Sequence, residues 1–157
     1  MRYDYSQGFK IADNILSNLG ISNFPYHTSK SEFKMNDDWV YVLSNEYFAG
    51  YYNSSSVKID NKNYIIKLWV KTVYTTEGEK TIINKIGVNF TDINHSLGLH
   101  LLDYKQWNYM IINLTYYAKS GNVLSNNEYP PKWNKIISDS VINSIFNKVL
   151  NDYNIQR

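Results

Sequence analysis

The 157-residue chain contains no cysteine, which excludes disulfide bridges, thiolate zinc sites, iron–sulfur clusters and a cysteine nucleophile. A large excess of one charge is also lacking, because sixteen Lys and Arg residues against fourteen Asp and Glu residues give a formal net charge of +2. So small an excess, without a Lys/Arg cluster, predicts that nucleic acid is not a partner. No apolar run approaches the roughly 18–20 residues of a membrane span, so we expect no transmembrane segment.

Glycine and proline are scarce, with seven and three residues. The glycines stand singly, and no GxGxxG loop, Walker loop or G-x-S-x-G elbow is present. His95 and His100 are five residues apart, a spacing that does not place both on one helical face as a ligand pair requires. We therefore predict no catalytic residue, no metal site and no cofactor. A hydrolase built on either histidine would need that side chain to converge with a carboxylate in a pocket.

The beginning of the chain is predicted to be an amphipathic helix followed by a linker. Apolar residues recur at three- and four-residue steps between Phe9 and Leu19, and Gly20 stands where a glycine ends a helix. Polar and turn-forming residues fill the next segment. We expect residues 1–37 to form an N-terminal helix and linker, and residues 38–157 to form the main domain. The first twenty residues lack the basic and apolar regions of a signal peptide.

From Trp39 onward the apolar period changes to two, which predicts strands over 39–43, 47–52, 56–60 and 64–74. The last two strands would form a hairpin. Apolar residues alternate with lysines in the strand 64–74, and burying an unpaired lysine costs several kcal/mol. We therefore expect one face to be the core face, made of Tyr64, Ile66, Leu68, Val70, Thr72 and Tyr74. The opposite face, which carries Lys67, Trp69 and Lys71, would be exposed.

The middle of the chain gives weaker signals. Residues 75–80 are expected to turn, 81–90 fit a return strand and a short helix equally, and 92–104 fit a loop or a short helix broken by Gly98. A long strand is predicted over 106–118, followed by a tight turn and a short strand over 122–125. Its inward residues would be Met110, Ile112, Leu114 and Tyr116, and its outward residues would include Trp107, Tyr109 and Tyr117.

Residues 139–153 are predicted to close the chain as an amphipathic helix, capped by Ser138 or Asp139. Pro130 and Pro131 end the sheet before this helix, because proline cannot donate to a strand ladder. The apolar stripe of the helix needs a cover, and the inner face of the sheet provides one. The predicted fold is α+β: a meandering antiparallel sheet packed by a C-terminal helix, with an extra N-terminal helix.

The outward face of the sheet combines aromatic rings with lysines, a composition that suits a binding or self-association surface. It would form a patch if the two long strands are neighbours and no helix covers them. The predicted ligand-binding residues are Lys67, Trp69, Lys71, Trp107, Tyr109 and Tyr117. In the alternative interpretation, the first helix or the linker covers this face, or the lysines lie across the tryptophans.

Several segments occur in the order found in the surface-adhesin protein E-like family, which the chain resembles over residues 38–153. They are Trp39–Val42, Gly50–Val57, Ile66–Thr72, Thr115–Ser125, Trp133–Ile136 and Ser138–Val141. The chain departs from the family pattern by the extra N-terminal helix expected above and in three details of sequence. It has no late cysteines, it has Asn53 in place of an aspartate, and it has Ser138 and Asp139 in place of Pro-Gly.

The resemblance implies an antiparallel sheet backed by a C-terminal helix, in an exported or cell-surface bacterial protein. It also implies a non-enzymatic module that binds a protein partner, such as a host or cell-surface protein. Use of the same face between two copies would give a homodimer. The alternative is an intracellular partner-binding protein, such as an immunity factor or a phage accessory protein, which would be cytoplasmic.

Overall fold

A computed structural model of the chain describes residues 38–157. The helix and linker expected within residues 1–37 lie outside the described residues, and the domain boundary drawn there stays a prediction. Neither helix of the described part has the length and apolar character that crossing a bilayer requires.

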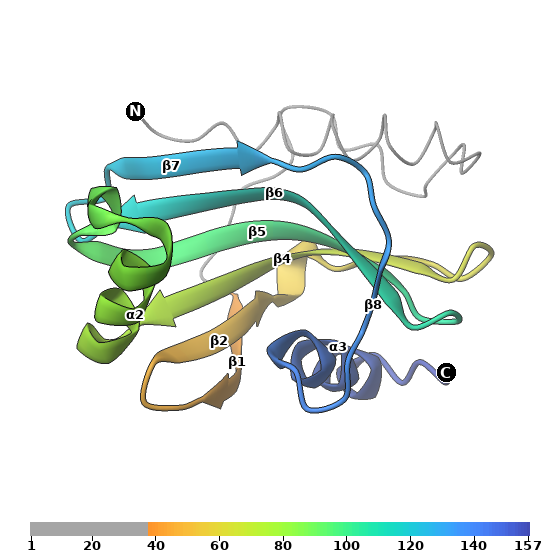
Figure 1. Cartoon of the computed structure of the whole chain (residues 1–157). Helices are drawn as coiled ribbons and strands as arrows, with labels where there is room; N and C mark the ends of the chain where they lie inside the picture. The colour runs from red at the N-terminus through yellow and green to blue at the C-terminus, as the bar shows by residue number, and fades with distance from the viewer. Residues whose placement is uncertain (1–37) are drawn as a thin grey trace.

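The described strands form one antiparallel sheet of eight strands (Figure 1). The main order is β1-β2-β4-β5-β6-β7, while β3 pairs with β4 and β8 pairs with β6. Strands that follow one another in the chain mostly lie side by side, which confirms the predicted meander. The bounds are β1 Trp39–Ser44, β2 Phe48–Asn53, β3 Lys58–Asp60, β4 Ile65–Tyr74, β5 Ile93–Asp103, β6 Asn108–Ala118, β7 Val123–Glu128 and β8 Asn134–Lys135.

Two α-helices pack on the same face of the sheet, at opposite ends (Figure 1). Helix α2 (Thr76–Ile86) joins β4 to β5, and its Ile82 packs against a cluster that includes Tyr116. Helix α3 (Val141–Asp152) closes the chain, and its Phe146 lies in the cluster that contains Leu68. Two short 3-10 turns, η1 (Ser54–Ser56) and η2 (Val88–Phe90), complete the described elements. The α+β class is therefore confirmed, with a C-terminal helix and a further helix in mid-chain.

The predictions for the middle of the chain are partly wrong. The expected turn over 75–80 is the start of α2, where the Thr75 side chain accepts a hydrogen bond from the Gly78 N–H at 3.1 Å. The expected loop over 92–104 is β5, which lies between β4 and β6. Gly98 does not break this strand. A Cβ built there would lie 2.8 Å from Nε2 of His100, so the glycine makes room for that ring.

The closing helix begins slightly later than predicted. Its N-cap is Ser140, whose side chain accepts a hydrogen bond from the Asn143 N–H at 3.1 Å. Asp139 precedes this cap with a φ of 64°. It therefore has the left-handed conformation that an aspartate tolerates better than most residues.

The side-chain alternation of β6 changes partway along the strand. Leu99 and His100 are adjacent in β5, yet their partners in β6 are Asn113 and Ile111. Ile112 is therefore an extra residue, a β-bulge, and the facing of every later side chain is switched by one position. Ile112 and Asn113 are both fully buried.

Gly78→Ala is expected to destabilise the protein, although alanine favours a helix over glycine by about 0.8–1.0 kcal/mol. A Cβ at Gly78 would lie 1.9 Å from the carbonyl oxygen of Tyr47, a backbone atom that also accepts a hydrogen bond from the Thr75 N–H. We expect the free energy of unfolding to fall by about 1–3 kcal/mol, as for other overpacked sites. Urea unfolding would measure this. The exposed control Asn84→Ala should be neutral or slightly stabilising, and equal stability of the two variants would contradict the proposed clash.

Candidate binding surfaces

The predicted outward face of β4 is buried. Trp69 and Lys67 are both 0 % exposed, and Trp69 lies in a cluster with Leu99 and Leu101. The prediction that the lysines keep this face exposed is therefore wrong at these two positions. The rule used for it concerns unpaired charges, and Lys67 is not without a partner. As a central strand, β4 instead packs apolar side chains on both faces of the sheet, with Ile66, Leu68 and Val70 on the side of α3.

Trp107 and Tyr109 lie on the other side of the sheet from Trp69. Both pack with the cluster that contains Phe146 of α3. Trp107 precedes β6 with a φ of 56°, and its indole N–H donates to Oδ1 of Asn143 at 3.2 Å. The guanidinium of Arg157 stacks 3.8 Å from its ring centre. The outward prediction for these two residues is wrong because the bulge at Ile112 reverses the alternation between Tyr109 and Tyr117.

The side of the sheet opposite α2 and α3 carries a row of partly exposed polar and aromatic side chains that begins on the edge strand β1. Tyr41 faces Tyr51 across β1 and β2, and Tyr51 faces Lys71 across β2 and β4. The two tyrosine rings meet edge to face at 5.8 Å, and Tyr41 is 52 % exposed. Lys71 Nζ lies 5.7 Å from the Tyr51 ring and 4.7 Å from the ring of Trp39. We call Tyr41, Tyr51 and Lys71 the edge row.

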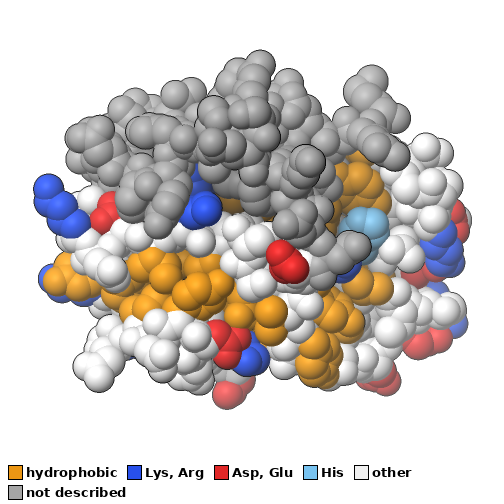
Figure 2. All heavy atoms as spheres, turned by 180° about the vertical axis from the view of Figure 1, so that it is seen from behind, with side chains coloured by type: hydrophobic (Ala, Val, Ile, Leu, Met, Phe, Trp, Pro, Cys, Tyr) orange, Lys and Arg blue, Asp and Glu red, His pale blue; other side chains and the backbone are white. Residues whose placement is uncertain are grey.

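Beyond the edge row, the same face of the sheet continues onto β5 and β6. His95 pairs with Tyr117 and stacks on its ring, with the centroids 4.8 Å apart. Burial and, second, the charge of Lys71 lower the pKa of His95. Tyr117 itself is buried. Lys71 and Tyr117 therefore lie on one face of the sheet, but Tyr117 is buried there, as are Lys67 and Trp69. Trp107 and Tyr109 lie on the opposite side. Seen from behind in Figure 2, the hydrophobic side chains of the described residues gather in separate patches.

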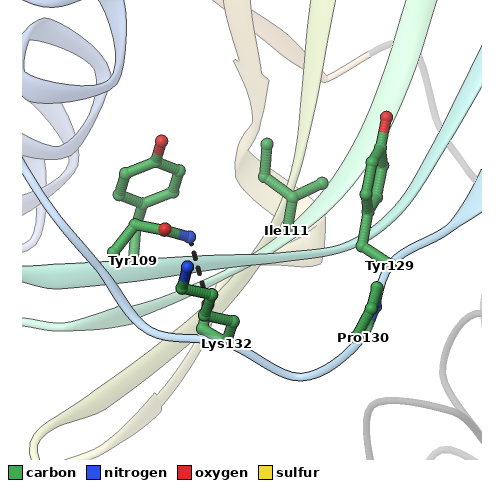
Figure 3. A pocket seen from close by; sticks show the side chains of 6 residues that line it. Tyr109, Ile111, Tyr129, Pro130 and Lys132 are labelled. Atoms are coloured by element: carbon green, nitrogen blue, oxygen red, sulfur yellow. Dashed lines mark hydrogen bonds between the residues drawn. The ribbon is translucent and has the colours of Figure 1, made fainter.

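A pocket of about 220 Å³ lies above Tyr109, between β6 and the connection from β7 to β8 (Figure 3). Tyr109, Ile111 and Tyr129 point to the same side in this view. The other lining residues are Pro130, Lys132 and Asn134. The side-chain amide of Asn134 donates to the backbone carbonyl of Lys132 at 3.1 Å, which folds the connection back on itself. Only Tyr109 of this set is among the predicted site residues. Four of the others, Tyr129, Pro130, Lys132 and Asn134, lie around the two prolines, where the sequence predicts the end of the sheet.

The two histidines of β5 do not form a joint site. Five residues apart on a strand, they project from opposite faces of the sheet. His95 meets Tyr117, whereas His100 lies edge to face with Phe146 of α3. His100 is fully enclosed, and burial lowers its pKa to about 4. Among residues 38–157, no group of three or more acidic or histidine side chains is arranged to hold a metal ion.

The segment Gly50–Val57, which carries part of the family resemblance, builds a turn beneath β4. Asn53 is buried, and its side-chain oxygen accepts hydrogen bonds from the Ser56 N–H at 3.0 Å and the Ser55 hydroxyl at 2.7 Å. The Ser56 hydroxyl in turn accepts from the backbone N–H of Trp69 at 2.9 Å. This segment therefore serves the fold, and asparagine can make these bonds where an aspartate would.

Comparison with known proteins agrees with this architecture. Residues 39–149 match a family model described as surface-adhesin protein E. The structure of Haemophilus influenzae protein E is similar in fold, with a TM-score of 0.50 and 10% sequence identity, over 79% of this chain and 92% of that one. No curated protein sequence matches the chain. Since the family match spans most of the described sheet and helix α3, the chain belongs to the surface-adhesin protein E family, a family of bacterial surface adhesins.

Proposed function

We propose that the chain is a non-enzymatic, cell-surface protein-binding module that contacts its partner through the edge row. The observation that carries this proposal is the partly exposed row of Tyr41, Tyr51 and Lys71 on a protein of an adhesin family. The partner would be a host protein, as the family name suggests. Of the residues predicted from the sequence, Lys71 would contact the partner. Tyr117 would hold the neighbouring His95 in place through the stacking of their rings.

The edge row has the properties of an interface anchor. Tyrosine offers a large contact area while few rotatable bonds are fixed on binding. The edge-to-face contact of the two tyrosines holds both rings in place before a partner arrives. Lys71 is likewise positioned by the rings of Trp39 and Tyr51. Such preorganisation lowers the entropic cost of association.

The position of the row at the edge of the sheet adds a second mode of contact. Among the described strands, β1 ends the sheet order, so its outer side has no neighbouring strand there. An edge strand offers backbone N–H and C=O groups to an added strand. A partner segment that lies along β1 would meet the ring of Tyr41, which is 52 % exposed.

The test is adhesion of beads coated with the chain to a panel of purified, immobilised extracellular-matrix proteins. We expect the double variant Tyr41→Ser/Tyr51→Ser to weaken binding to the recognised protein by about tenfold or more, as truncation of interface anchors does. Lys71→Ala should also weaken this binding. The matched control is Tyr64→Asn, which changes another exposed tyrosine at a φ of 61° that asparagine tolerates.

Circular dichroism and urea unfolding would show that each variant is folded. If the double variant binds as well as the unchanged chain, or if Tyr64→Asn loses as much binding, the edge row is not the contact surface. If no matrix protein on the panel is bound, the proposed adhesin activity itself is refuted for this class of partner.

A further inference from the structure

We infer that the pocket above Tyr109 is a second binding site, which takes one aromatic or large aliphatic side chain from an acidic peptide segment. It lies on the α3 side of the sheet, because Tyr109 packs with the cluster around Phe146, whereas the edge row lies on the opposite side. The inference therefore does not depend on the proposed function. We call this site the β6–β8 pocket, after the strands that bound it.

The pocket exists because the chain leaves the sheet at two consecutive prolines. β7 pairs with β6 as far as the Asn113–Glu128 pair, and β8 pairs with β6 from the Tyr109–Asn134 pair. Pro130 and Pro131 lie between these pairings, and neither has an N–H to donate to the ladder. The connection therefore bulges outward. At Met110 and Ile111, β6 pairs with β5 on one side, and no described strand pairs with it on the other.

The walls of the pocket suit a ring or a branched aliphatic group. Two tyrosines and a proline line the space, and Ile111 lies between the two tyrosines (Figure 3). Tyr129 is 41 % exposed, so its ring is accessible to a partner. At about 220 Å³ the pocket is smaller than the roughly 300–1,000 Å³ that enclose a whole small-molecule ligand. It would therefore hold one side chain of a larger partner.

The positive charges beside the pocket favour a partner whose remaining residues are acidic. The connection and β8 carry Lys132 and Lys135 and no acidic residue between Tyr129 and Ile137. Both lysines are exposed, and neither forms a salt bridge within residues 38–157. An acidic segment would neutralise them, and opposite charges at the rim of an interface speed association and favour one partner over others. Rigid prolines also keep the pocket formed in the absence of a partner.

The probe is the acetylated and amidated peptide Asp-Glu-Phe-Asp-Glu, titrated into the full chain labelled with ¹⁵N. We expect saturable shifts of the backbone amides of Tyr109, Ile111 and Asn134, and weaker binding at high salt. Tyr129→Ala and Lys132→Glu should each weaken binding by about tenfold. The control Lys85→Glu makes the same change in net charge on the exposed side of α2, and it should leave the affinity within about twofold.

Three further probes complete the test. The peptide in which alanine replaces phenylalanine should bind at least about tenfold more weakly, and so should a peptide with lysines in place of the acids. Equal binding of either one, or an equal effect of Lys85→Glu, would overturn the inference. Saturable binding of sialyllactose in preference to the acidic peptide would overturn it in favour of a carboxylated glycan. Loss of the shifts in Tyr129→Ala while the edge-row variants retain them would support a site separate from the proposed adhesion surface.

Discussion

Replacing Trp69 by alanine is expected to lower the free energy of unfolding by about 3–5 kcal/mol, the range found for aromatic residues truncated in a core. The Trp69 side chain is 0 % exposed and packs with Leu99 and Leu101 of β5. Its removal would leave a cavity between β4 and its neighbours that those side chains fill only in part. Urea unfolding followed by circular dichroism would measure the change. A loss of this size is a large fraction of the 5–15 kcal/mol that typically stabilises a domain.

This experiment also decides between the two interpretations of the outward face. If Trp69 belonged to an exposed binding patch, the variant would keep nearly its full stability and lose only a contact. The matched control is Tyr41→Ala, which truncates an aromatic residue on the same side of the sheet that is 52 % exposed. We expect Tyr41→Ala to cost less than about 1 kcal/mol. Similar stability losses in the two variants would contradict the burial of Trp69.

Acid is expected to destabilise the protein through His100. Burial lowers the pKa of His100 to about 4 in the folded chain, against 6.5 for an unhindered imidazole. Between these two values the unfolded chain binds the proton and the folded chain does not, so stability decreases as the pH falls from 6.5 to 4. At about 1.4 kcal/mol for each pH unit, the full loss is about 3 kcal/mol. The contribution is fully present above pH 6.5.

The surroundings of His100 explain why its protonation is unfavourable in the folded state. Its cross-strand neighbours are Leu68 and Ile111, and the ring of Phe146 lies 6.3 Å away. None of these side chains can share a positive charge. Nδ1 has no hydrogen-bond partner within the described residues, so the imidazolium would bury an unsatisfied N–H.

Urea unfolding at several pH values would test this prediction in the variant His100→Leu. We expect this variant to lose most of the pH dependence between 6.5 and 4. The control His95→Asn removes the other histidine of β5, whose pKa is also lowered, and shows how much of the slope belongs to that residue. An unchanged slope in His100→Leu would rule out His100 as the acid-sensitive group.

Strand periodicity and hairpin signals in the sequence were enough to predict most of the sheet. β1, β2, β3, β4 and β6 lie where alternation placed them, because each combines apolar alternation with a turn signal at its end. β5 was missed for a local reason. In the sequence alone Gly98 looks like a strand breaker, but in the sheet its missing side chain leaves room for the ring of His100. The start of α2 was missed because Gly78 suggests a turn, whereas it lies against the carbonyl of Tyr47.

The candidate surfaces were harder to predict because they depend on which face of a strand is covered. Alternation in β4 separated Lys67 and Trp69 from Leu68 correctly, but it could not show that both faces are buried. In β6 the alternation misplaced Tyr109, since one extra residue at Ile112 switches the facing and no residue type signals it. Two adjacent prolines did mark the end of the β6–β7 pairing, and that signal could have indicated a hollow beside Tyr109.

The extra residue in β6 also determines where the strand can change in length. Deletion of Ile112 would join the two halves of β6 in one regular alternation, with both hairpin partners kept in register. Deletion at a position away from Ile112 and its two neighbours would force part of the strand to exchange its inner and outer side chains. In an alignment of relatives, a single gap opposite Ile112 would therefore leave the architecture intact, and shorter versions of this strand should have lost a residue there.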